Sequence, residues 1–245
     1  MNTIKKIGNL KLAFLFFLVF GSISIVDGGT AINRIIRVIP LAFAIVIILL
    51  GFRNKSHKYV IAFLLGHLLS GLFAIKYESP IYRELTIIFG LLGNLALGLS
   101  VIPKFNKIKT NWFLGIYFVI CLVLAIYTLY GVTEISRVQL ANNFHFILMN
   151  LGYLSLLFIL TSAMLFVHQK PNKISMLLLG FVMVFALSEL ARGASYYSNT
   201  RVEVFFYGCR ILYVLSLAIL INCCGVLDDF EEREMMIPEV ESLKD

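Results

Sequence analysis

The stretch "ISMLLLGFVMVFALSELARGASYY", residues Ile174 to Tyr197, decides the fold class. As a helix rising about 1.5 Å per residue, it is long enough to cross the roughly 30 Å hydrocarbon core of a bilayer. In lipid a helix satisfies its own backbone hydrogen bonds, which a lone strand does not. The stretch therefore predicts a membrane-spanning helix, with Glu189 and Arg192 one turn apart inside it.

The composition extends this reading to the whole chain. Of its 245 residues 60% are hydrophobic and only 14% are charged, and the mean hydropathy is +0.90. This is more apolar side chain than one soluble core of this length buries, which excludes a soluble domain, a nucleic-acid-binding protein and a disulfide scaffold. We expect an all-α polytopic membrane bundle.

Apolar runs of near-membrane length recur along the chain, separated by short polar connections. They predict eight transmembrane helices, at Leu10 to Val26, Ile35 to Phe52, Tyr59 to Ile75, Tyr82 to Ile102, Trp112 to Tyr130, Phe144 to Val167, Ile174 to Tyr197 and Val204 to Val226. The first run follows a basic segment and contains Ser22 and Ser24, so an alternative is a cleaved signal peptide that leaves seven spans.

The lysines predict the orientation. Lysines fall at the amino terminus and in every second connection, whereas the connections between these carry Lys76 alone. The lysines of the first set are Lys5, Lys6, Lys11, Lys55, Lys58, Lys104, Lys107, Lys109, Lys170 and Lys173. By the positive-inside rule both termini are cytoplasmic, and we expect a bacterial inner (cell) membrane. Residues 1–227 then form the transmembrane domain, and residues 228–245 an acidic cytoplasmic tail that either docks a protein partner or keeps the end soluble.

Ionisable residues inside spans cost about 3 kcal/mol each on insertion scales and usually face a partner or a cavity. Glu189 is the only acid well inside a predicted span. The other intramembrane polar residues that we single out are His67, Asn94, Ser188, Arg192, Tyr207, Arg210 and Tyr213, with Arg37 near the outer end of the second span.

Glu189 and Arg210 lie at similar depth, about 9 Å from the outer ends of consecutive helices, so we expect them to meet. Two interpretations stay open. Glu189 is either a structural anchor that neutralises Arg192 and Arg210, or part of a site in which the excess of arginine binds an anionic head group. No metal or cofactor is expected, because the histidines lack metal spacing and no phosphate or nucleotide motif is present.

Several segments together resemble the YhhN family of multi-pass membrane proteins, which includes the lysoplasmalogenases. They are "RVIP" (37–40), "LLGHLLSG" (64–71), "FGLLGNLALGL" (89–99), "FVMVFALSELARGASYY" (181–197) and "YGCRILYVLSLAILI" (207–221). The chain departs from the family pattern at three positions: His67 replaces the aspartate of the third span, Asn94 the histidine of the fourth, and Glu189 the aspartate of the seventh. Arg210 is a further departure, since the family's eighth span is uncharged there.

The resemblance implies hydrolysis of the vinyl ether bond of a lysoplasmalogen, through a protonated enol ether that water captures. It assigns Glu189 as acid or cation stabiliser and His67 as water activator. The implied substrate-binding residues are Arg37, Asn94, Ser188, Arg192, Arg210 and Tyr213.

Two other functions remain open. One is a non-catalytic protein that keeps the fold and binds a membrane lipid, a lysophospholipid or another small molecule. The other is a transporter coupled through Glu189, which the positions of the prolines near span ends and in connections disfavour.

Overall fold

The computed structural model describes residues 8–26, 29–52, 57–101, 143–197 and 203–236, and a few isolated positions between 116 and 131. Every element in this part of the chain is helical. The helices are α2 (Asn9–Ser24), α3 (Gly29–Gly51), α4 (Lys58–Ala74), α5 (Pro80–Val101), α7 (Asn143–Gln169), α8 (Lys173–Tyr197) and α9 (Glu203–Met236). The prediction of an all-α bundle is confirmed for these residues.

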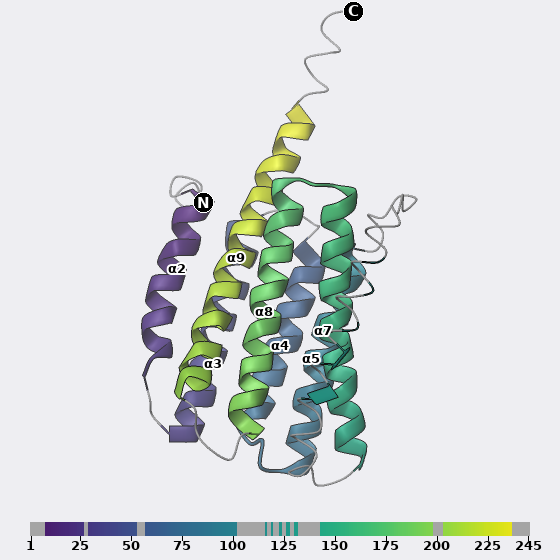
Figure 1. Ribbon diagram of the computed structural model, residues 1–245. Helices are drawn as coiled ribbons and strands as arrows, with labels where there is room; N and C mark the ends of the chain where they lie inside the picture. Colours follow the sequence, from purple (N-terminus) through teal and green to yellow (C-terminus); the bar gives the residue numbers. More distant parts are fainter. Residues whose placement is uncertain are drawn as a thin grey trace, which may run out of the picture.

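Six of the described helices pack in a closed ring. Each contacts the next in the order α3, α4, α5, α7, α8 and α9, and α9 packs back against α3. The remaining helix, α2, lies outside the ring against α9 and α3. α2 begins, and α9 ends, at the same end of the bundle (Figure 1). We call the opposite end, where α4 and α8 end and α5, α7 and α9 begin, the distal end.

Five of the helices are long and apolar enough to cross a membrane, so the chain has the character of a multi-pass membrane protein. The candidate spans are Ile32–Gly51, Pro80–Val101, Asn143–Gln169, Lys173–Tyr196 and Glu203–Asp229. The first and third predicted spans form the shorter helices α2 and α4, of 16 and 17 residues. At 1.5 Å per residue these reach only about 24–26 Å. The fifth predicted span lies largely outside the described residues, so five spans stand here where eight were predicted.

The last helix continues past the predicted start of the tail. α9 runs to Met236, and Asp228 is buried within it. Asp229 accepts a hydrogen bond from the Asn9 side chain at 2.8 Å, which ties the ends of α2 and α9 together. Residues 237–245 lie outside the described part.

The half of the ring nearer the chain termini is filled by apolar side chains. Phe63, Phe181 and Phe185 are almost fully buried and contact one another with ring centroids 5.3–5.8 Å apart. Leucines and isoleucines of α3, α8 and α9 complete this core, while other apolar residues of these helices, such as Leu50, Leu187 and Val204, are exposed. An apolar exterior is what hydrocarbon contact requires. This aromatic cluster fills the interior of the ring next to its distal half.

Glycines bring α4 and α5 into close contact. A Cβ atom on Gly66 would lie 2.8 Å from the Cα of Gly93, and one on Gly93 would lie 2.9 Å from the carbonyl oxygen of Phe63. Real Cβ atoms do not approach backbone this closely, so only glycine fits at both positions. The contact sets His67 and Asn94, one residue further along each helix, against each other.

We predict that Gly93→Ala lowers the stability of the purified protein by about 1–3 kcal/mol, because backbone rather than a movable side chain blocks the new methyl group. The measurement is the thermal unfolding midpoint in one detergent, followed by far-ultraviolet circular dichroism. Gly180→Ala is the matched control, since its Cβ would meet no atom within 4 Å. Equal midpoints for the two variants would contradict the close contact.

Candidate functional site

The distal half of the ring encloses a cavity of about 630 Å³. All six ring helices contribute to its wall: residues 33–41 of α3, 67–74 of α4, 86–94 of α5, 149–156 of α7, 189–196 of α8 and 206–213 of α9. The volume lies within the range of about 300–1,000 Å³ that is usual for small-molecule sites. The cavity is therefore an interior feature of the ring and not a groove on one helix pair.

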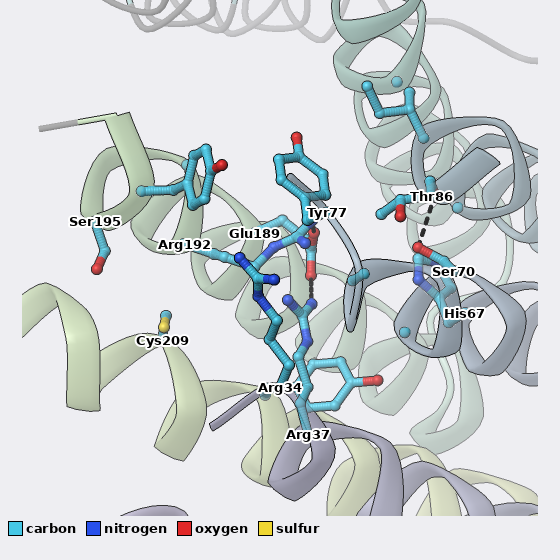
Figure 2. A pocket seen from close by; sticks show the side chains of 18 of the residues that line it. Arg34, Arg37, His67, Ser70, Tyr77, Thr86, Glu189, Arg192, Ser195 and Cys209 are labelled. Atoms are coloured by element: carbon cyan, nitrogen blue, oxygen red, sulfur yellow. Dashed lines mark hydrogen bonds and ion pairs between the residues drawn. The ribbon is translucent and has the colours of Figure 1, made fainter. Parts of the chain in front are cut away.

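Glu189 is the centre of the charged part of this cavity. Its Oε1 accepts from Nη2 of Arg37 on α3, and its Oε2 accepts from Nη2 of Arg192 one turn along α8. Figure 2 shows the carboxylate between the two guanidinium groups. Only 7% of the Glu189 side chain is exposed, against 23% for Arg37 and 42% for Arg192. The carboxylate is thus shielded, while Arg192 keeps an open face.

Arg210 does not follow the prediction that it meets Glu189. Its Nη1 donates to the backbone carbonyl oxygens of Ser24 and Val26, at 3.3 and 3.1 Å, and its guanidinium lies over the Phe206 ring. The side chain is directed toward the end of α2, because α2 ends against α9 at this level. Arg37 from α3 takes the place expected for Arg210, and it also lies over the Tyr213 ring at 4.5 Å.

The end of the cavity nearer the aromatic cluster, which we call its inner end, is lined by polar side chains that form hydrogen bonds with one another but no ion pairs. Nε2 of His67 lies 3.1 Å from Oδ1 of Asn94, and Nδ2 of Asn94 donates to the Ser155 hydroxyl at 2.9 Å. The imidazole also contacts the rings of Phe63 and Phe185, at 4.5 and 5.0 Å. His67 therefore stands at the boundary between the aromatic core and the cavity.

The distal rim is tied by a bidentate ion pair. Nη1 and Nη2 of Arg34 donate to the two carboxylate oxygens of Glu78 at 2.9 and 2.6 Å, and Nη1 also donates to the Ile75 carbonyl oxygen at 3.0 Å. The hydrogen bond from Arg34 holds the pKa of the Glu78 carboxyl at about 2, below its ordinary 4.5. Tyr77 meets Tyr196 edge to face beside this pair, with ring centroids 5.0 Å apart. The short connection after α4 is thereby fastened to α3 and α8.

Arginine outnumbers carboxylate in the cavity wall. Arg34, Arg37, Arg192 and Arg210 line it, and Glu189 is the carboxylate among the described lining residues. Arg34 pairs with Glu78 from outside the wall, whereas Arg37 and Arg192 share the one carboxylate of Glu189, so the group of Arg37, Glu189 and Arg192 carries one net positive charge. Guanidinium groups bind carboxylate and phosphate through paired N–H donors. The wall is suited to an anionic ligand.

Most of the residues singled out from sequence meet in this cavity. Seven of the eight predicted site residues line it, namely Arg37, His67, Asn94, Glu189, Arg192, Arg210 and Tyr213. The exception is Ser188, which is 1% exposed and donates to the Cys209 carbonyl oxygen at 2.9 Å, joining α8 to α9.

Sequence reasoning did not find the remaining polar residues of the wall. Arg34, Tyr77 and Thr86 sit at or near span ends, where polar residues carry little signal. Ser70 was detectable, since it follows His67 by one helical turn and so shares its face. Figure 2 shows Ser70 and Thr86 on the same side of the charged group as His67.

The fold and cavity define a class: a helical, multi-pass membrane protein with a positively charged site inside a ring of helices. No protein-family model matches the chain, and neither does any curated protein or solved structure.

We predict that Glu189→Gln lowers stability by about 1–3 kcal/mol, because it removes the charge-assisted hydrogen bonds at the buried end of both ion pairs and leaves the partly exposed Arg37 and Arg192 without their shared counterion. Glu78→Gln is the control, since that side chain is 70% exposed and an exposed ion pair contributes at most about 1 kcal/mol. Unfolding midpoints in the same detergent compare the two variants. Equal small losses would show that the buried ion pairs do not hold the ring together.

Proposed function

We propose that this chain is a YhhN-like integral membrane protein whose distal cavity binds a lysophospholipid. The observation that carries the proposal is the excess of arginine over carboxylate in the wall of a cavity of about 630 Å³ inside a ring of apolar helices. A lysophospholipid offers a phosphate for Arg37 and Arg192, a glycerol hydroxyl for the inner polar groups, and one acyl or alkenyl chain. Apolar wall residues such as Leu41, Leu91 and Leu156 are suitable contacts for the chain.

The enzymatic form of the proposal is hydrolysis of the vinyl ether bond of a lysoplasmalogen, as the family resemblance implies. A proton adds to the vinyl carbon that is not bonded to the ether oxygen, which leaves an oxocarbenium ion. Water adds to the carbon next to the oxygen and loses a proton, and the resulting hemiacetal breaks down to a fatty aldehyde and a glycerophospho alcohol. His67 is the candidate water activator. Glu189, whose two oxygens already accept from guanidinium groups, is better placed to stabilise the cation than to supply the proton.

Non-catalytic lipid binding is the second candidate. The observation that favours it is the same pair of contacts at Glu189, because a carboxylate that accepts from two guanidinium groups has no proton to donate. Protonation of the enol ether must then come from another group or from solvent.

One experiment separates the two candidates. Purified full-length protein in nanodiscs is given a 1-alkenyl lysophospholipid, and both binding and aldehyde release are measured; a 1-alkyl lysophospholipid, which has no vinyl group to protonate, is the control ligand. We expect both ligands to bind, and Arg192→Met to weaken both at least tenfold. Aldehyde release that His67→Gln abolishes supports the hydrolase, and binding without release supports the lipid-binding protein. Absence of binding would refute both.

We further propose eight spans, with both termini in the cytoplasm of a bacterial inner membrane. The alternation of lysine between connections supports this orientation. It places the distal end and the cavity on the outer side.

Cysteine labelling tests the orientation in intact cells. Glu78→Cys at the distal end is expected to react with a membrane-impermeant maleimide, whereas Lys170→Cys between α7 and α8 reacts only after permeabilisation. Both wild-type side chains are exposed, so access to the reagent is set by the side of the membrane. The unsubstituted chain controls for its own cysteines, and the reverse pattern would invert the proposed topology.

A further inference from the structure

A buried chain of hydrogen bonds crosses three helices at the inner end of the cavity. It runs from His67 on α4 to Asn94 on α5 at 3.1 Å, from Asn94 to Ser155 on α7 at 2.9 Å, and from Ser155 to the backbone carbonyl of Gly152 at 2.6 Å. His67 is 8% exposed, and Asn94 and Ser155 are each 4% exposed. Because these hydrogen bonds join buried side chains on different helices, they fix how the imidazole, the amide and the hydroxyl face one another.

The last contact sets the direction of every donor in the chain. The Gly152 carbonyl oxygen only accepts, and two oxygens 2.6 Å apart repel unless a proton lies between them, so the Ser155 hydroxyl donates to it. That hydroxyl has no second proton, so its oxygen accepts from the Asn94 amide nitrogen. The amide oxygen of Asn94 then faces His67, and Nε2 of the imidazole must carry the proton.

A neutral imidazole that carries its proton on Nε2 has its lone pair on Nδ1. The Nε2 edge of the ring lies close to Gly93, where an added Cβ atom would be 3.1 Å from Cδ2 and 3.4 Å from Nε2. Phe63 and Phe185 contact the ring as well. His67 lines the cavity, and within the described residues its ring forms a hydrogen bond through Nε2 alone, so a cavity ligand that reaches Nδ1 meets a hydrogen-bond acceptor and not a donor.

We infer that the inner end of the cavity is a subsite for a hydroxyl group or a water molecule, which donates a hydrogen bond to Nδ1 of His67. Asn94 and Ser155 are positioning residues, because their hydrogen bonds keep the proton of the imidazole on Nε2. The identity of the ligand rests on the proposed function, whereas the tautomer of His67 does not. In a bound lysophospholipid the donor is the free glycerol hydroxyl. In the hydrolytic reaction it is the attacking water, which Nδ1 orients.

The tautomer is measured directly by ¹⁵N nuclear magnetic resonance of the full-length protein in detergent, labelled at histidine and held at about pH 7.5. The protonated and unprotonated ring nitrogens of a neutral imidazole have well-separated shifts, and His67→Gln identifies the His67 signals by their loss. We expect the Nε2–H form in the wild type. A dominant Nδ1–H form would overturn the inference, whatever the protein binds.

Variants of Ser155 test the positioning role. Ser155→Ala frees the Asn94 amide to turn and is expected to give a mixture of both tautomers, and Ser155→Thr, which keeps a hydroxyl, restores the Nε2–H form. Ser162→Ala removes another buried serine of α7 and is expected to leave the tautomer unchanged. A pure Nε2–H form in Ser155→Ala would show that the chain does not set the tautomer.

Ligand preference tests the subsite. Wild-type protein is expected to bind a lysophospholipid about three to ten times more tightly than its analogue with the glycerol hydroxyl methylated, which is the range of one hydrogen bond. Ser155→Ala narrows this ratio toward one, while Ser162→Ala preserves it. Equal wild-type affinity for both ligands refutes the subsite. If neither ligand binds, the proposed function fails, and the tautomer measurement still decides the positioning role.

Discussion

The two ion pairs that Glu189 forms with Arg37 and Arg192 determine what occupies the interior of the distal half of the ring. A carboxylate among membrane-depth helices needs its countercharge within reach, since an unpaired buried charge costs several kcal/mol. Arg192 lies on the same helix, but Arg37 lies on α3, and the ring order places α9 between α3 and α8. The two side chains therefore meet across the interior, and the space that long polar side chains need there keeps the helix backbones apart. The cavity follows from this pairing.

The same six helices behave differently in the other half of the ring. There Phe63, Phe181 and Phe185 occupy the interior, where their rings contact one another edge to face or stacked and are almost fully buried. Gly66 and Gly93 meanwhile draw α4 and α5 together at the level of His67. One wall of the cavity is thus rigid by backbone contact, and its inner end is closed by aromatic packing. These two features keep His67 and Asn94 in place where the polar half begins.

Sequence alone predicted the helices well, because apolar runs of membrane length admit no other structure. It also found Glu189, the one acid well inside a predicted span, and most of the residues that line the cavity with it. It failed on the partner: Arg210 has the right depth, but depth along a helix leaves the direction around the axis undetermined, and contact with the end of α2 turns Arg210 elsewhere. Arg37 can pair with Glu189 because the ring closes through the contact of α9 with α3, which brings two segments that are distant in the sequence to the same interior.

The two interpretations of Glu189, structural anchor or part of a binding site, are not exclusive. Each guanidinium has five N–H donors, and Glu189 accepts through one nitrogen of each. The carboxylate thus fixes the direction of Arg37 and Arg192 while leaving most of their donor capacity uncommitted to it. One carboxylate shared by two arginines leaves the group of Arg37, Glu189 and Arg192 with a net positive charge. A fixed pair of guanidinium groups with surplus positive charge recognises an anion better than two mobile ones, because less side-chain entropy is lost on binding. The ion pairs that join α3 and α8 thus also orient the guanidinium donors that the proposed phosphate site requires.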